Sequence, residues 1–290
     1  MFVNWWILLF VAQVFLFALF TISFLNVKQG QRPKAPEADH LPKGDYPLVD
    51  KLIFIVIDAL REDFVFGPNS PMSFTKMLIK NGSAVPYIAK ASAPTVTLPR
   101  LKALTAGTPP VFLDFISNLN EGKQNDASDS WVKQLYLTGK KIVFLGDDTW
   151  LRLFPREYFI RADPTTSFYV KVLLNLFPNR QDTVIVDRNV TRHIREEFTQ
   201  NKDWDVLIMH YLGVDHVGHV EGAKGYTFFI FLLDHRPLMG PKLQEMDSVI
   251  ETVYKLTKSH LGDQRTAIFV LGDHGMSDSG NHGGASPEEV

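Results

Sequence analysis

The stretch KLIFIVI at Lys51–Ile57, which is followed directly by Asp58, decides the fold class of this chain. The run is short, β-branched and aromatic, and this composition is typical of a strand that is buried on both faces of a parallel sheet. Residues 206–212 and 267–271 form two later runs of the same kind. Helical patterns lie between the runs, and strands that alternate with helices indicate an α/β fold: a mostly parallel sheet with helices on both faces.

The remaining elements are expected between these three runs. Residues 141–145 read as a fourth buried strand, which also ends in acids, Asp147 and Asp148. Apolar spacing and turn residues predict helices at 59–63, Ser73–Lys80, 100–104, 131–138, 189–199 and 241–260. Two apolar stretches, 171–181 and 225–233, fit no element of this pattern. We therefore expect one α/β domain over residues 51–290.

Aspartate and histidine follow each of the three buried runs. They are Asp58 after the first run, Asp215 and His219 after the second, and Asp273, His274 and His282 after the third. Ligands of open α/β sheets bind at the carboxyl ends of the strands, so we expect these side chains to meet there. The chain has no cysteine; carboxylate and imidazole ligands suit zinc, with manganese or another divalent ion as the alternative. A single Asp–His pair would read as a capping or loop feature, but the whole group predicts a metal site.

A hydroxyl group is placed suitably for a reaction at such a site. In APTVTLPR, residues 93–100, Thr97 comes just before an expected helix that carries Pro99 in its first turn. A helix N-terminus favours a phosphoryl group, and two metal ions can activate a hydroxyl and stabilise an in-line displacement at phosphorus. The alternative for Thr97 is an ordinary N-cap. The pattern indicates metal-assisted phosphoryl transfer.

The N-terminal part of the chain predicts a membrane anchor. Trp5–Leu25 is almost entirely apolar, and about 20 such residues span a bilayer. A cleaved signal peptide is less favoured because the run has no basic residue before it and no small-residue cleavage site after it. We expect an anchor at 1–26 and a proline-containing linker at 27–50.

Charge and sequons bear on partners and on orientation. The 290 residues carry a formal net charge of −2, and no basic stripe indicates nucleic acid. Basic residues after the apolar run, Lys28, Arg32 and Lys34, would place that side in the cytosol. Two sequons, at Asn81 and Asn189, are glycosylation candidates and would place the domain on the opposite side.

Four motifs in one order resemble the alkaline phosphatase superfamily. They are IVIDALR at 55–61, PTVTLPR at 94–100, DHVGH at 215–219 and DHGM at 273–276. The motifs LGDDTW at 145–150, LFP at 153–155 and NHGG at 281–284 are most similar to the glycosylphosphatidylinositol (GPI) ethanolamine phosphate transferases, and 161–168 resembles the members that act on the second mannose. The resemblance covers 51–290.

This resemblance implies a site with two divalent ions, expected to be zinc. Asp58, Thr97, Asp273 and His274 would hold one ion, and Asp215, His219 and His282 would hold the other. Thr97 would be the nucleophile that takes phosphoethanolamine from phosphatidylethanolamine, with Thr95 as the alternative, and a mannose of the GPI precursor would accept the group. The family works in the membrane of the endoplasmic reticulum with its catalytic domain in the lumen, and association with a small multi-pass subunit is also implied.

The chain also departs from the family pattern. It stops after SPEEV at 286–290, so a C-terminal truncation of the catalytic domain is expected, and residues 225–233 interrupt a stretch that is continuous in the family. Two other functions remain open from the sequence. One is a hydrolase similar to the nucleotide pyrophosphatases/phosphodiesterases, and the other is an inactive truncated product.

Overall fold

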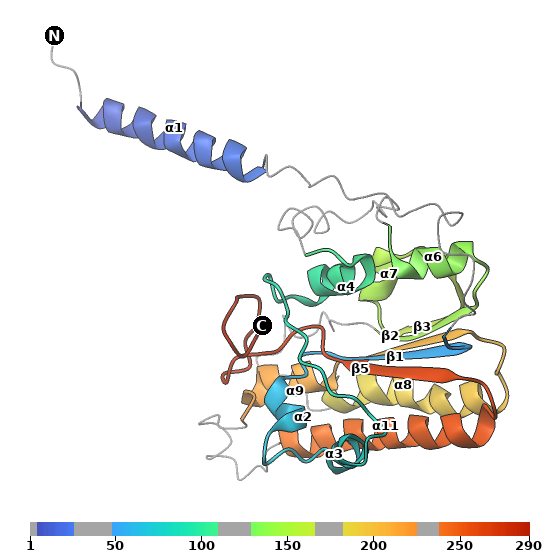
Figure 1. Cartoon of the computed structure of the whole chain (residues 1–290). Coiled ribbons are helices and arrows are strands. Elements are labelled where there is room, and N and C mark those ends of the chain that lie inside the picture. Colours follow the sequence, from blue (N-terminus) through green and yellow to red (C-terminus); the bar gives the residue numbers. More distant parts are fainter. Residues whose placement is uncertain (1–4, 26–47, 110–128, 166–181, 225–237) are drawn as a thin grey trace.

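A computed structural model describes residues 5–25, 48–109, 129–165, 182–224 and 238–290 of the chain (Figure 1). Most of the expected linker 27–50 lies outside the described residues, and so do the stretches 171–181 and 225–233.

The centre of the domain is a parallel sheet. Its five strands are β1 (Lys51–Ile57), β2 (Ile142–Asp147), β3 (Phe159–Thr165), β4 (Val206–Tyr211) and β5 (Thr266–Leu271). They lie in the order β3-β2-β4-β1-β5, and every pair is parallel. The ends of the central strands are level, because Ile57 pairs with Tyr211 and Val56 pairs with Leu271. Residues that follow β1, β4 and β5 therefore emerge at one edge of the sheet.

Helices cover both faces of this sheet, which confirms the predicted α/β architecture (Figure 1). On one face lie α4 (Thr97–Ala106), α6 (Trp131–Leu137) and α7 (Thr149–Leu153); on the other lie α2 (Glu62–Phe66), α3 (Ser73–Lys80), α8 (Asp182–Thr199), α9 (Gly213–Glu221) and α11 (Met239–His260). The two remaining elements are α1 (Trp5–Leu25) and a 3₁₀ turn, η2 (Arg156–Tyr158).

Alternation along β1 builds one hydrophobic core on each face of the sheet. Ile53, Ile55 and Ile57 are at most 1% exposed and belong to the core under α8, α9 and α11. Val56 faces the other way, into a core that contains Leu101 of α4. Successive side chains of a strand point to opposite faces of the sheet, so a strand that is apolar at every position contributes to both cores.

The predicted helix at 59–63 is wrong. The chain turns after β1 and the helix begins only at Glu62, because Ala59 has a φ of 57° and Arg61 is extended. A left-handed residue cannot lie inside an α-helix. The helix predicted at 189–199 begins earlier, at Asp182, and β3 was not predicted at all, since its sequence FIRADPT has no apolar periodicity.

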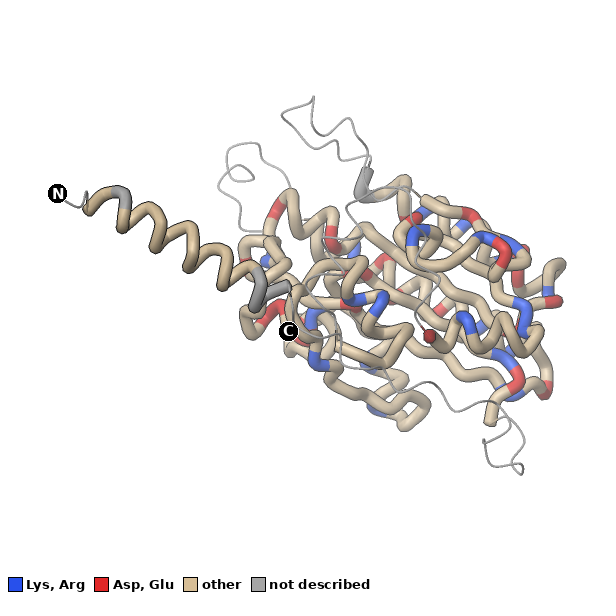
Figure 2. Tube along the Cα trace, turned by 90° about the horizontal axis from the view of Figure 1, so that it is seen from above, with Lys and Arg blue, Asp and Glu red and all other residues tan. Residues whose placement is uncertain are grey.

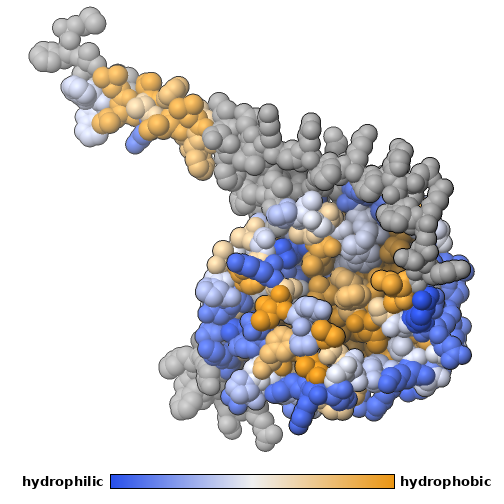
Figure 3. All heavy atoms as spheres, in the orientation of Figure 1, coloured by the Kyte–Doolittle hydropathy of each residue, from blue (hydrophilic) through white to orange (hydrophobic). Residues whose placement is uncertain are grey.

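The expectation that 267–271 is buried on both faces is also wrong. β5 pairs only with β1 in the described part of the chain, and the side chain of Phe269 is 55% exposed. The β5 edge is turned towards the viewer in Figure 1, and apolar side chains gather on that face in Figure 3. An apolar run therefore predicts a strand here, but not how many neighbours the strand has.

Charged residues of both signs are spread over the domain. Lysine and arginine are interspersed with aspartate and glutamate along the trace in Figure 2. Within the described ranges, no helix combines the length and the apolar character required to cross a bilayer. The anchor at 1–26 stays a prediction.

Candidate metal centre

Two groups of predicted ligands meet at the carboxyl edge of the sheet. The first consists of Asp58, Asp273 and His274, which come directly after β1 and β5 and are at most 3% exposed. His274 Nε2 lies 3.4 Å from Asp58 Oδ1 and 3.5 Å from Asp273 Oδ2. His274 Nδ1 lies 2.8 Å from the backbone oxygen of Gly275 and donates to it, and Nε2 faces the two carboxylates.

The backbone around Asp273 is held by neighbouring residues. Asp273 Oδ1 accepts hydrogen bonds from the amides of Ala59 and His274, at 3.2 Å and 2.9 Å. The Nε of Arg100, on α4, donates to the backbone oxygen of Asp273 at 3.0 Å. The left-handed turn at Ala59 brings its amide to Asp273, so this strained residue ties β1 to the segment after β5.

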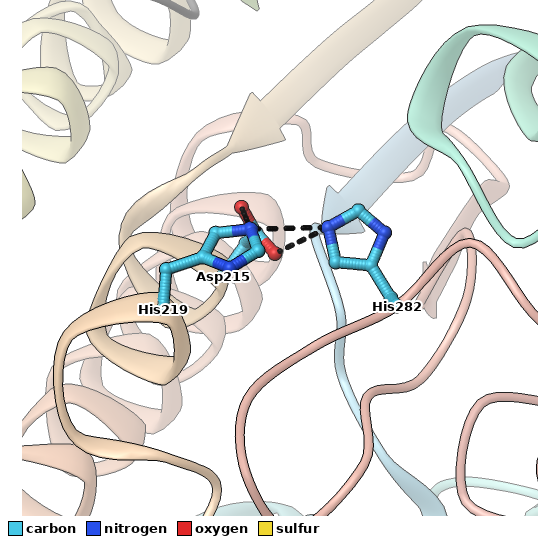
Figure 4. Close-up of side chains that lie close together, drawn as sticks. All are labelled: Asp215, His219 and His282. Carbon is cyan, nitrogen blue, oxygen red and sulfur yellow. Dashed lines mark hydrogen bonds and ion pairs between the residues drawn. The ribbon is translucent and has the colours of Figure 1, made fainter. Parts of the chain in front are cut away.

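The second group consists of Asp215, His219 and His282 (Figure 4). Asp215 and His219 lie one turn apart on α9, with 3.3 Å between Asp215 Oδ2 and His219 Nε2. His282 Nε2 lies 3.3 Å from Asp215 Oδ1 and 3.1 Å from His219 Nε2. Positions i and i+4 of a helix share a face, which explains the convergence.

Gly218 has a packing role in this helix. A Cβ at this position would lie 2.3 Å from Met276 Sδ, so glycine lets α9 approach the segment that follows β5. The same approach brings the two groups together: the rings of His274 and His282 are stacked with their centroids 4.2 Å apart. The six predicted Asp and His ligands therefore form one site.

Electrostatics indicates that this site requires positive charge. Burial, followed by the negative charges of Asp273 and Asp215, raises the pKa of Asp58 well above its ordinary value. Burial alone would also raise the pKa of Asp215, but hydrogen bonding to His219 and His282 holds it below its ordinary value. The buried carboxylates around Asp58 therefore lack a neighbouring positive charge that would stabilise their ionised form.

The donor atoms fit divalent ions. Three buried ligand atoms of the first group have no hydrogen-bond partner in the described part of the chain: Asp58 Oδ1, Asp273 Oδ2 and His274 Nε2. Leaving buried polar atoms unpaired is costly, and carboxylate oxygens and imidazole nitrogens that face one another are the usual ligands of zinc. The first group is fully buried, whereas the His219 side chain is 44% exposed, so the site opens towards solvent at the second group.

The two candidate threonines have different surroundings. Thr97 is the first residue of α4, is half-buried, and its hydroxyl donates to Asp58 Oδ2 at 3.2 Å. The N-cap is Val96, so Thr97 is not the N-cap that was considered from the sequence. Thr95 is fully buried, and its hydroxyl bonds to Gly283, Gly284 and Glu289. Of the two, only the Thr97 hydroxyl lies beside a metal-ligand candidate.

A third grouping, which the sequence did not reveal, lies behind the first. His210, inside β4, is 3.7 Å from Asp58 through its Nε2 and 3.6 Å from Asp147 through its Nδ1. Trp150 of α7 donates from Nε1 to His210 Nδ1 at 3.2 Å. The signal in the sequence was a histidine within an otherwise apolar strand.

The glycosylation candidates differ in their setting. Asn81 is exposed at the end of α3, and Asn189 is half-buried inside α8. Glycosylation at either position stays a prediction.

This fold and site can be compared with known proteins. A family model described as type I phosphodiesterase / nucleotide pyrophosphatase matches residues 52–286. The chain belongs to this family. Two bacterial domains have similar folds. One is the C-terminal periplasmic domain of EcEptC from Escherichia coli in complex with Zn, with a TM-score of 0.52 and 13% identity over 79% of this chain and 64% of that one. The other is the C-terminal periplasmic domain of the phosphoethanolamine transferase EptC from Campylobacter jejuni, with a TM-score of 0.51 and 15% identity over 80% of this chain and 71% of that one.

Relatives with higher sequence identity carry a single name. The chain is 45% identical over 244 residues to GPI ethanolamine phosphate transferase 2 of Aspergillus fumigatus, and 40% identical over 277 residues to GPI ethanolamine phosphate transferase 2, catalytic subunit, of Homo sapiens. The alignments cover 83% and 92% of this chain, but 29% and 26% of those proteins. The resemblance to the GPI ethanolamine phosphate transferases is confirmed, and the chain spans less than a third of the length of these two relatives.

Proposed function

We propose that this chain carries the catalytic site of a phosphotransferase that moves phosphoethanolamine from phosphatidylethanolamine to the second mannose of a GPI precursor. One observation carries the proposal: the hydroxyl of Thr97 lies at the start of α4, 3.2 Å from Asp58, at a site where two groups of metal-ligand candidates meet. The relatives named GPI ethanolamine phosphate transferase 2 support this donor and this acceptor.

The transfer proceeds in two steps, with Thr97 as the nucleophile. In the first step, Thr97 Oγ1 forms a bond to phosphorus, the bond from phosphorus to the glycerol oxygen breaks, and diacylglycerol leaves with the threonine proton. In the second step, a mannose hydroxyl bonds to the same phosphorus, the bond to Thr97 Oγ1 breaks, and the mannose proton returns to Thr97. Splitting the transfer in this way replaces one difficult displacement with two easier ones.

Residues of the chain orient both steps. Asp58 accepts the hydrogen bond of Thr97 and so directs the Oγ1 lone pairs away from itself, towards the open side of the site. In the first turn of α4, Pro99 has no N–H and the amide of Arg100 donates to Val96. The amides of Thr97 and Leu98 have no acceptor within the helix, and together with the helix dipole they favour a phosphoryl group beside Thr97.

Zinc is the metal that the ligands favour. Asp58, Asp273, His274 and Thr97 would hold one ion, and Asp215, His219 and His282 the other. When bound, the two ions supply positive charge that activates the hydroxyl and offsets the charge on the phosphoryl oxygens. The zinc-bound EptC domain, which shares this fold, and the absence of cysteine from the chain agree with this choice.

We also propose that the protein acts at the membrane of the endoplasmic reticulum, with this domain in the lumen. Support comes from the apolar run Trp5–Leu25, which begins with two tryptophans that suit a membrane interface, and from substrates that are both lipids. We further propose a small multi-pass membrane subunit as a partner; the relative from Homo sapiens is named a catalytic subunit, which implies at least one further subunit.

Labelled phosphatidylethanolamine tests the function directly. The 290-residue chain is loaded with zinc and incubated with the labelled lipid in mixed micelles, and the covalent label on the protein is mapped. We expect the label on Thr97, loss of the label in Thr97→Ala, and retention in Thr97→Ser, which keeps a hydroxyl group. A mannose-containing GPI precursor should then remove the label and become phosphoethanolamine-modified.

Other results would contradict the proposal. Label that persists in Thr97→Ala excludes Thr97 as the nucleophile. Hydrolysis of a nucleotide phosphodiester without any transfer to mannose would assign the hydrolytic activity that the family description also names.

A further inference from the structure

We propose that Thr95 is a positioning residue, which acts with Glu289 to hold His282 in the orientation that binds metal. The inference rests on the proposed metal site. It assigns a role to a buried hydroxyl and a carboxylate that take no part in the transfer steps above. Three sets of contacts lead to it: those of the His282 ring, those of the Thr95 hydroxyl, and the backbone between them.

The ring of His282 is oriented by the backbone of Thr95. His282 Nδ1 lies 2.8 Å from the backbone oxygen of Thr95, so Nδ1 carries the proton and donates it. Nε2, the ring nitrogen that remains for a metal ion, then faces Asp215 and His219, at 3.3 Å and 3.1 Å. A histidine that binds metal through one nitrogen usually donates its other N–H to such an acceptor, which fixes both the tautomer and the ring.

The hydroxyl of Thr95 holds the backbone that follows His282. Thr95 Oγ1 accepts a hydrogen bond from the amide of Gly283 at 2.8 Å and donates to Glu289 Oε2, also at 2.8 Å. The same Oε2 accepts from the amide of Gly284 at 2.6 Å. Two successive amides after His282 are therefore held by one hydroxyl and one carboxylate, and the hydroxyl links them.

Glycine at position 283 permits this arrangement. Gly283 has a φ of 111°, a conformation that other residues rarely adopt, and it turns the chain so that its amide faces Thr95. His282 is thus fixed at both ends: its ring by the carbonyl of Thr95 and its following peptides by the side chains of Thr95 and Glu289. The 0% exposure of Thr95 keeps water from replacing these bonds.

A role as an alternative nucleophile does not fit these contacts. The Thr95 hydroxyl proton is committed to Glu289 or to the nearby oxygen of Gly284, at 3.0 Å, and one lone pair is committed to Gly283. The hydroxyl of Thr97, by contrast, is bonded to a ligand of the site. Two threonines of one motif therefore have separate tasks, one reacting and one positioning.

Zinc binding tests the inference without reference to turnover. The 290-residue chain is titrated with zinc against a chromophoric chelator, which gives the affinities of the two ions separately. Thr95→Val keeps the shape of the side chain but removes the hydroxyl. We expect it to lower the affinity for the ion that His282 would hold by about 10-fold or more, which is the size expected when a contact behind a metal ligand is lost. The affinity for the other ion should not change. Thr95→Ser, which restores the hydroxyl, should bind both ions as the parent does.

Two further variants separate positioning from general stability. Glu289→Ala should lower the affinity for the same ion. The double variant Thr95→Val, Glu289→Ala should lose less binding free energy than the sum of the two single losses, because the two side chains form one network. Thr105→Val is the matched control: Thr105 is another buried threonine, on α4, whose hydroxyl bonds to the backbone oxygen of Leu101, and its loss should change neither zinc affinity.

The outcomes distinguish this inference from the proposed function. If the parent binds two zinc ions and a folded Thr95→Val binds both equally well, the positioning role is overturned and the metal site stands. If Thr95→Val unfolds, Glu289→Ala decides in the same way. A parent that binds no zinc overturns the metal site, and this inference with it.

Discussion

A buried ion pair beneath α9 provides the sharpest test of how the site is supported. Lys242 Nζ of α11 lies 3.0 Å from Asp187 Oδ2 of α8, and the two side chains are 4% and 0% exposed. The other oxygen, Asp187 Oδ1, accepts from the amides of Leu212 and Gly213, at 3.1 Å and 3.0 Å, where the chain passes from β4 into α9. Asp187 thereby holds the start of the helix that carries two metal-ligand candidates.

The substitution Lys242→Met removes the cation and keeps a side chain of similar length. Asp187 is then left as a buried carboxylate with two amide hydrogen bonds but without the ammonium that neutralises it. Breaking a buried ion pair from one side costs about 3–5 kcal/mol, and we expect a loss of this size in the free energy of unfolding. Adding Asp187→Asn removes the second charge, keeps an acceptor oxygen for the amides, and should recover most of the loss.

Unfolding in urea, followed by tryptophan fluorescence, measures these differences, since Trp150 and Trp204 are both buried. The matched control lies on the same helix: Lys255 pairs with Glu251 at 2.7 Å, but the two side chains are 68% and 38% exposed. Lys255→Met should cost only about 0–1 kcal/mol, because water already solvates that pair. If Lys242→Met lowers the free energy of unfolding no more than Lys255→Met does, burial does not make the Lys242–Asp187 pair more important for stability than an exposed pair, and the reasoning is wrong.

Three further predictions concern the metal site, the sheet and acid stability. His219→Ala and Asp273→Ala should each lose one equivalent of zinc after dialysis, and a double variant that binds zinc as the parent does would contradict the ligand assignment. Gly139 has a φ of 76° and no atom near a new Cβ, so Gly139→Ala should lower the free energy of unfolding in urea by about 1–2 kcal/mol. Gly146→Ala should lower it more, because its Cβ would lie 2.1 Å from a backbone oxygen of β4. Equal losses for the two variants would refute this close approach. Burial would raise the pKa of Asp163, but hydrogen bonds from Arg192 and His193 of α8 lower this pKa below its ordinary value of 3.8. The ionised carboxylate therefore stabilises the fold above pH 3.8, and this stabilisation is lost as the pH falls through the lowered pKa. Asp163→Asn should therefore be less stable than the parent at about pH 6, and the difference should shrink below pH 3.8 in unfolding measured across this range; a constant difference would count against the ion pair.

The fold class and the candidate ligands follow from the amino-acid sequence alone. Four of the five strands were predicted because each is a short apolar run, and composition within a few residues suffices to indicate a buried strand. The ligand candidates followed from the same runs, since the residue after a buried strand must emerge at the edge of a parallel sheet. β3 was missed because its sequence carries no such local pattern.

Tertiary structure decided the geometry of the site. Asp215 and His219 share one face of α9, and His210 reaches the site from within β4. The difference between Thr95 and Thr97 depends on contacts across the fold: Thr95 bonds to Glu289, 194 positions away, and Thr97 bonds to Asp58, 39 positions away. Thr95 and Thr97 are only two positions apart and share almost the same local sequence. Only the packing of distant segments gives Thr95 a structural partner and places Thr97 beside the metal-ligand candidate Asp58.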